Sequence, residues 1–119
     1  MKNCLVFAVA LAPLTACSRA PEHVVPGGNV ERGREQIVAV GCGACHVING
    51  IPGARGQVGP ALSGVASRAV IAGVLPNTPD NITRWIEDAP SISPQTAMPN
   101  LGLSQAQARD IAAYLYARQ

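Results

Sequence analysis

Aromatic and charged residues are both scarce in this sequence. Aromatic residues make up 3% and charged residues 13% of its 119 residues, which leaves room for one domain without an aromatic-rich core. Lys2 is the sole lysine, and no run of basic residues occurs. A formal net charge of +2 is too small to indicate nucleic acid or an acidic lipid surface as a partner. We therefore expect no nucleic-acid function.

The N-terminus has the pattern of an export signal. A cationic start precedes an apolar stretch, residues 5–14, that is shorter than the roughly 20 residues needed to span a bilayer. The stretch ends in Leu14-Thr15-Ala16-Cys17, which resembles the lipobox of bacterial lipoproteins. The resemblance implies a signal peptide over residues 1–16 and a lipid on Cys17. An ordinary signal-peptidase site remains the alternative, although its candidate Ala10-Leu11-Ala12 is followed by Pro13, which disfavours cleavage.

Residues 17–28 contain prolines and glycines and no helical apolar pattern, which indicates a flexible tether. We expect an exported protein that is lipid-anchored to the cytoplasmic or the outer membrane and faces the periplasm or the cell exterior. The remaining residues, 29–119, would form one domain.

Two cysteines remain for chemistry once Cys4 is removed with the signal and Cys17 carries lipid. Cys42 and Cys45 both lie in "CGACH", which His46 completes. A thioredoxin-like pair would need a strand-to-helix junction, and a structural zinc site would need a fourth ligand. The pattern C-x-x-C-H is typical of c-type haem attachment, with both thiols bonded to the haem and His46 as the proximal iron ligand. A structural disulfide stays open as the alternative.

Met98 is the expected second axial ligand. It is the one methionine left after signal removal, and it lies in the proline-flanked segment "SPQTAMPN". A lone methionine usually packs in the core. In a small haem protein that has no other thioether, ligation of the iron becomes the expected role. His23 competes for this role, but it precedes the domain in the predicted tether.

Three helices are predicted around this cofactor. The first covers residues 30–40, with Asn29 as N-cap and Gly33 where another helix would cross closely. The second begins at Thr78-Pro79 and ends at Pro90, and the third runs from the capping box at Ser104 to Arg118. A fourth helical stretch is possible near residues 66–72, and strands are not expected.

The order of these pieces resembles a class I cytochrome c over about residues 28–119, and is similar to the cytochrome c domain fused to subunit II of bacterial haem–copper oxidases. The pieces are a glycine-bearing first helix, "CGACH", "GPALSG", "WIEDAP", "PQTAMP" and "AAYLYA". No copper-binding or membrane-spanning part of that subunit is present. The resemblance implies an all-α fold with three main helices and loops wrapped around one covalent haem c.

The resemblance also implies roles for single residues. The Pro60 carbonyl would accept a hydrogen bond from His46, Gly59 would let that loop approach, and Gly33 with Tyr114 would form a helix crossing. The candidates for contact with the haem propionates are Arg68, Trp85 and Thr96.

These features predict a membrane-tethered electron carrier rather than an enzyme. With His46 and Met98 both on the iron, no position is left for a small-molecule substrate. The resemblance implies a terminal oxidase as electron acceptor and a quinol-oxidising complex or a dehydrogenase as donor. Two alternatives stay open: the cytochrome subunit of a periplasmic dehydrogenase, or a haem enzyme or gas binder if Met98 is not a ligand.

Overall fold

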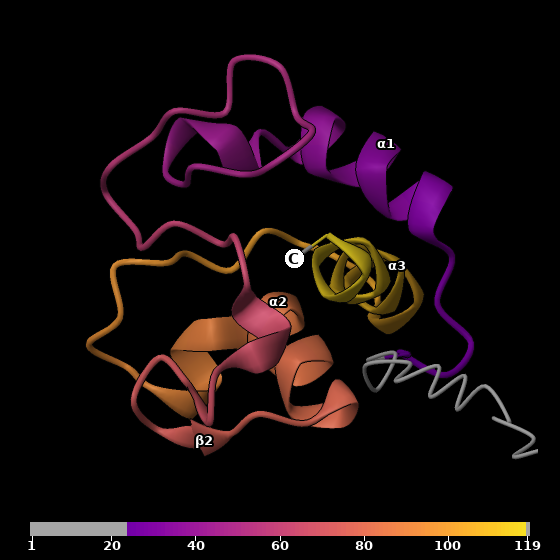
Figure 1. Ribbon diagram of the computed structural model, residues 1–119. Helices are drawn as coiled ribbons and strands as arrows, with labels where there is room; N and C mark the ends of the chain where they lie inside the picture. Colours follow the sequence, from indigo (N-terminus) through magenta and orange to yellow (C-terminus); the bar gives the residue numbers. More distant parts are fainter. Residues whose placement is uncertain (1–23, 119) are drawn as a thin grey trace, which may run out of the picture.

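The computed structural model describes residues 24–118, and it has the predicted all-α architecture (Figure 1). Three helices dominate: α1 (Val30–Val40), α2 (Pro79–Ile92) and α3 (Gln105–Ala117). α3 packs against both α1 and α2 and lies between them. Two short 3-10 turns, η1 (Cys42–Ala44) and η2 (Val65–Ser67), and long loops complete the domain.

The three predicted N-caps are confirmed. The Asn29 side chain accepts a hydrogen bond from the Arg32 N–H. The Thr78 side chain, directly before Pro79, accepts one from the Asn81 N–H. Ser104 and Gln107 form the reciprocal bonds of a capping box. Each bond satisfies an N–H that has no partner within its own helix, so the polar caps determine where the helices begin.

Helix α2 is interrupted close to its predicted end. Asp88 has non-helical φ and ψ of −154° and 76°, and a last short turn continues from there through Pro90 to Ile92. Proline lacks the N–H that a helix interior needs, and its ring disturbs the preceding turn. The regular part of α2 therefore ends just before Pro90, and the Asp88 side chain accepts a hydrogen bond from the Ser91 N–H (3.4 Å) at the start of the short turn.

Only the start of the segment near residues 66–72 is helical, in η2, and the expectation that strands are absent was wrong. η2 ends at Ser67, and a two-stranded antiparallel hairpin follows, β1 (Val70–Ile71) and β2 (Leu75–Pro76). The turn between them has positive φ at Ala72 (50°) and Gly73 (74°). A helix cannot pass through such a pair of residues, which explains the short strands.

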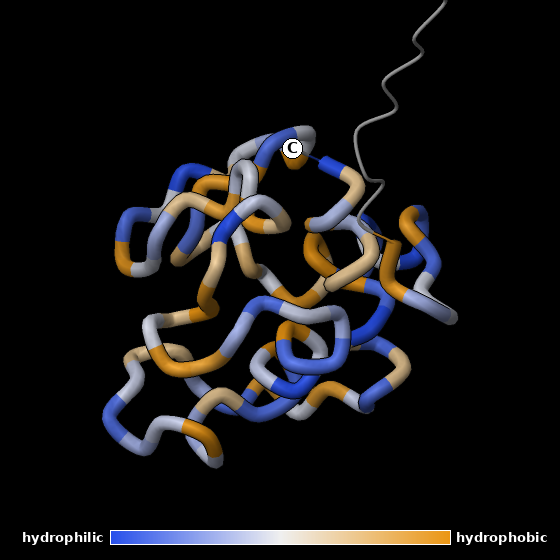
Figure 2. The backbone as a smooth tube through the Cα atoms, turned by 60° about the horizontal axis from the view of Figure 1, so that its bottom comes forward, coloured by the Kyte–Doolittle hydropathy of each residue, from blue (hydrophilic) through white to orange (hydrophobic). Residues whose placement is uncertain are grey.

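The core is built mainly from small and branched aliphatic residues. Ile37, Ile111 and Tyr114 are the largest fully buried side chains, and Ala108 and Ala112 on α3 have no exposed surface. Hydrophobic stretches also lie on outer turns of the chain (Figure 2). The exposed valines include Val38, Val58, Val70 and Val74.

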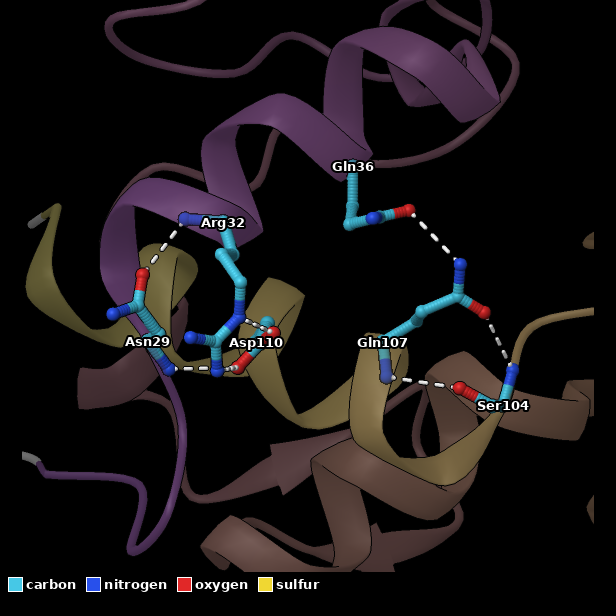
Figure 3. A network of polar contacts seen from close by, with 6 residues as sticks. All are labelled: Asn29, Arg32, Gln36, Ser104, Gln107 and Asp110. Atoms are coloured by element: carbon cyan, nitrogen blue, oxygen red, sulfur yellow. Dashed lines mark hydrogen bonds and ion pairs between the residues drawn. The ribbon is translucent and has the colours of Figure 1, made fainter.

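The crossing of α1 and α3 confirms the predicted role of Gly33. A methyl group on Gly33 would lie 3.0 Å from Cβ of Tyr114 and would overlap the Asp110 carbonyl. Beside this contact, Asp110 accepts hydrogen bonds from the Asn29 N–H (2.8 Å) and from Nε of Arg32 (2.7 Å) (Figure 3). About one turn away, Gln107 donates to Gln36 (3.2 Å) and joins the same two helices. The close packing at Gly33 and the hydrogen bonds of Asp110 to Asn29 and Arg32 therefore both fix the start of α1 to α3.

The packed domain begins before the predicted boundary at Asn29. Val25 is 4% exposed, and a methyl group on Gly28 would meet Ala113 at 2.6 Å. Val25 and Gly28, predicted as part of the tether, thus belong to the packed domain. The signal peptide, Cys17 and His23 lie outside the described residues. Within residues 24–118, no helix is long and apolar enough to cross a membrane.

Candidate functional site

An apolar cavity of about 310 Å³ lies between the helices and the long loops. Its walls come from all three helices, from η1, from the loop around Pro60 and from the loop around Met98. The residues predicted as functional that line it are Cys42, Cys45, His46, Gly59, Pro60, Arg68, Trp85, Thr96 and Met98. The structure therefore brings together positions that are widely separated in the sequence.

The cysteine pair lies on the tight turn that follows α1. Gly41 ends the helix with φ of 82°, and the N–H groups of Cys45 and His46 both donate to the Cys42 carbonyl. This turn places both cysteines and the histidine on one wall of the cavity. The thiols of Cys42 and Cys45 are free in the structure. Burial raises the pKa of the Cys42 thiol.

His46 is oriented by the loop that faces it. Its ring Nδ1 lies 2.7 Å from the Pro60 carbonyl oxygen, the contact expected from the resemblance. A carbonyl oxygen only accepts, so Nδ1 carries the proton and Nε2 keeps its lone pair for a metal. A methyl group on Gly59 would lie 2.7 Å from Nδ1, so this position has no space for a side chain. The close approach explains the glycine.

Met98 faces the same cavity from the loop between α2 and α3. Its side chain is half-buried and packs against the hydrophobic core. Its N–H donates to Oγ1 of Thr96 (3.2 Å), and the Thr96 N–H donates to the Ser93 carbonyl (3.0 Å). These bonds form a compact turn that holds Met98 in place.

Trp85 and Arg68, two candidates for propionate contact, differ in their surroundings. Trp85 is 9% exposed and belongs to the hydrophobic core. Arg68 is exposed, and its Nη2 donates to the carbonyls of Ala61 (2.5 Å) and Ser63 (3.3 Å). The guanidinium thus binds the loop that follows Pro60.

The donors in the cavity fit a haem. The wall supplies two thiols three residues apart, an imidazole with a free Nε2, and a thioether from a separate loop. These are the groups that attach and ligate haem in c-type proteins. Among residues 24–118, no group of three or more His, Cys, Asp and Glu side chains is placed to hold a metal ion. The apolar lining suits a porphyrin, which would complete a core that is poor in aromatic residues.

Sequence reasoning missed two residues beside the cavity, Asn77 and Tyr116. The hydroxyl of Tyr116 lies 2.5 Å from Oδ1 of Asn77, and the Asn77 amide donates to two backbone carbonyls near Arg68. The sequence offered little signal, because Asn77 precedes the Thr78-Pro79 cap and is typical of a helix-flanking loop.

Comparison with known proteins agrees with the cavity and its donors. The family model described as cytochrome c matches residues 30–118. Cytochrome c oxidase subunit 2 of Alkalihalophilus pseudofirmus is 35% identical over 68 residues, which cover 57% of this chain and 19% of that protein. The chain therefore spans about a fifth of the length of this relative. Because the family match includes all three helices and the cysteine pair, this chain belongs to the cytochrome c family, whose members carry covalently bound haem c.

Proposed function

We propose that this protein is a single-haem electron carrier in which Cys42 and Cys45 hold the haem and His46 and Met98 ligate its iron. The observation that supports this most strongly is that all four side chains line one apolar cavity. When bound, the haem supplies the one-electron couple between ferric and ferrous iron.

The two thiols would attach the cofactor covalently. Cys42 and Cys45 would each bond through sulfur to one vinyl carbon of the haem, and the thiol hydrogen would pass to the other vinyl carbon. No oxidant is needed, because the addition is redox-neutral. Burial raises the pKa of Cys42, which favours the thiol over the thiolate before attachment.

The two side chains that would ligate the iron, His46 and Met98, would set its reduction potential. His46 is held with Nε2 available by the bond from Nδ1 to Pro60, which also increases the basicity of the ring. Met98 supplies a soft thioether, which favours ferrous iron and raises the reduction potential. With both positions filled by the chain, no site is left for a substrate, which supports a carrier rather than an enzyme.

Polar groups at the cavity wall would bind the propionates. Arg68, Trp85 and Thr96 all line the cavity, and each carries a hydrogen-bond donor. The lining residues Val58 and Val70 are 72% and 52% exposed, so the cavity reaches the surface beside them. We propose that electrons enter and leave there, through apolar contact with the redox partner.

The membrane and the partners belong to the same proposal. Lipid on Cys17 would tether the protein to the outer face of the cytoplasmic membrane or to the outer membrane. The similarity to a protein named cytochrome c oxidase subunit 2 supports a terminal oxidase as acceptor. The donor would be a quinol-oxidising complex or a dehydrogenase.

Extraction of the purified protein with acidified acetone tests haem attachment. We expect the colour to stay with the protein and a pyridine haemochrome spectrum typical of two thioether bonds. Cys42→Ala and Cys45→Ala should each shift that spectrum toward one thioether, and the matched change Cys17→Ser should leave it unaltered. A colourless protein after extraction of the unmodified chain would contradict the proposal.

A further inference from the structure

The loop around Pro60 is held at three places. On the cavity side, the Gly59 N–H donates to the Cys45 carbonyl (2.8 Å), and the Leu62 N–H donates to the Val47 carbonyl (2.9 Å). The Pro60 carbonyl that accepts from His46 lies between these two bonds. On the other side, the carbonyls of the residues after Pro60 accept from Arg68.

Arg68 makes a two-point contact with this loop. One nitrogen, Nη2, donates to both the Ala61 and Ser63 carbonyls, so its two hydrogens serve two acceptors. A cationic donor makes a stronger bond to a carbonyl than a neutral donor does. An exposed arginine nevertheless loses side-chain entropy when it is held in one geometry, which normally offsets the gain. The net contribution of Arg68 to holding this loop therefore depends on how well the backbone of Arg68 is fixed.

Asn77 fixes that backbone. Its Nδ2 donates to the carbonyls of Val65 and Arg68, both at 2.8 Å. Its own N–H donates to the Ala69 carbonyl at 3.0 Å. One asparagine thus binds both ends of the turn from which the Arg68 side chain extends.

Asn77 is in turn fixed to the most buried helix. Its Oδ1 accepts from the hydroxyl of Tyr116, which is 3% exposed on α3. A continuous series of hydrogen bonds therefore leads from α3 through Asn77 and Arg68 to the loop that orients His46.

We propose that Arg68 and Asn77 are positioning residues for the proximal histidine: they hold the Pro60 carbonyl against Nδ1 of His46 through the Ala61 and Ser63 carbonyls. This inference rests on the proposed function, in which His46 ligates the iron. It assigns Arg68 a role in addition to propionate contact, and it assigns Asn77 a role that its sequence context did not indicate.

The reduction potential alone cannot separate the two roles of Arg68. A looser bond from His46 to Pro60 makes the imidazole less basic, which favours ferrous iron and raises the potential. Loss of a nearby positive charge favours ferric iron and lowers the potential. Exchange of the Nδ1 proton with solvent reports only on the hydrogen bond, because that proton is protected while the Pro60 carbonyl holds it.

The test is the exchange rate of the His46 Nδ1 proton, measured by NMR in the ferrous holoprotein. We expect Arg68→Leu and Asn77→Ala each to accelerate exchange about tenfold, the effect of losing one hydrogen bond from the series. Arg84→Leu removes the same charge from an exposed site on α2 and should leave the rate unchanged. Asn77→Ala keeps the positive charge of Arg68 and removes the bonds that hold its backbone, so it separates the hydrogen-bond series from the charge.

The outcomes separate the two proposals. A spectrum of the unmodified protein without histidine-ligated, low-spin iron would overturn the proposed function, and this inference with it. A normal spectrum together with an unchanged exchange rate in folded Arg68→Leu and Asn77→Ala would overturn the inference alone. Exchange accelerated in Arg68→Leu but not in folded Asn77→Ala would overturn the role of Asn77 and would show that Arg68 acts without the hydrogen-bond series.

Discussion

Replacement of Asp110 should weaken the domain at the contact between α1 and α3. The carboxylate is 9% exposed and accepts from the Asn29 N–H at 2.8 Å and from two nitrogens of Arg32. In Asp110→Ala the Asn29 N–H loses its charged acceptor, which costs about 1.5–3 kcal/mol. Alanine regains about 0.5 kcal/mol of helix propensity over aspartate. The net loss is therefore about 1–2.5 kcal/mol in the free energy of unfolding.

Asp110→Asn should lie between the unmodified protein and Asp110→Ala. The amide keeps an oxygen for the Asn29 N–H, but a neutral hydrogen bond is roughly half as strong as one to a charged group. Arg32→Gln should cost less than Asp110→Ala, because the Arg32 side chain is 60% exposed and water screens its charge. Glu35→Gln, on the exposed side of α1, is the control and should change the free energy of unfolding by at most about 0.5 kcal/mol.

The stabilisation by the Asp110 carboxylate should be lost as the pH falls. Burial acts to raise the pKa of Asp110, but hydrogen bonds from Arg32 and the Asn29 N–H and the charges of Arg32 and Arg109 lower it. A carboxylate with a lowered pKa stabilises the fold above its unfolded pKa of about 4, and this contribution is lost as the pH falls further. The difference between the unmodified protein and Asp110→Asn should shrink below about pH 4.

The assay is denaturation of the holoprotein in guanidinium chloride at pH 7 and across an acid series. A lower midpoint at constant slope would indicate lost stability without a change in the denatured state. An Asp110→Ala variant as stable as Glu35→Gln at pH 7 would show that the Asp110 carboxylate does not stabilise the contact between α1 and α3. If the difference in the free energy of unfolding between the unmodified protein and Asp110→Asn grew on acidification, the pKa of Asp110 would not be lowered in the folded protein.

Three further predictions concern the site and the surface. Gly59→Ala should destabilise the holoprotein by about 1–3 kcal/mol, since the added methyl meets the His46 ring; an unchanged denaturation midpoint would contradict this. Cys17→Ser should release the protein from membranes or stall its processing without altering the haem spectrum, and an unchanged membrane fraction would exclude a lipid tether. Electron transfer from a lipid-free form to its native oxidase should depend weakly on salt, since eight arginines face seven acidic residues once the predicted signal peptide is removed; a steep fall in stopped-flow rates would reveal a charged docking patch.

The helices were predictable because local chemistry determines them. Asn29, Thr78-Pro79 and the Ser104 capping box mark helix starts independently of the rest of the chain. Prediction from the local sequence failed where tertiary packing determines the backbone conformation. The hairpin after Ser67 depends on a turn with positive φ at Ala72, a residue type that favours helices in isolation.

The site was predictable to the extent that its residues have unusual chemistry. Cys42, Cys45, His46 and Met98 are rare residue types in this sequence, so composition and spacing drew attention to them. The structure places all four on one cavity, and their roles in haem attachment and iron ligation stay predictions. Asn77 and Tyr116 are ordinary residue types, and their hydrogen bond joins positions 39 residues apart. Contacts of this kind arise from the packing of α3 against the loops and leave no periodic pattern in the sequence.

Ligation of the iron by Met98 is tested most directly by the far-red absorbance band of the ferric protein, which arises from a bond between sulfur and haem iron. Met98 lines the same cavity as Cys42, Cys45 and His46. We expect the unmodified protein to show this band with low-spin iron, and Met98→Ala to lose it, to bind carbon monoxide readily and to have a lower reduction potential. A band that persists in Met98→Ala, or that is absent from the unmodified protein, would contradict the claim that Met98 ligates the iron.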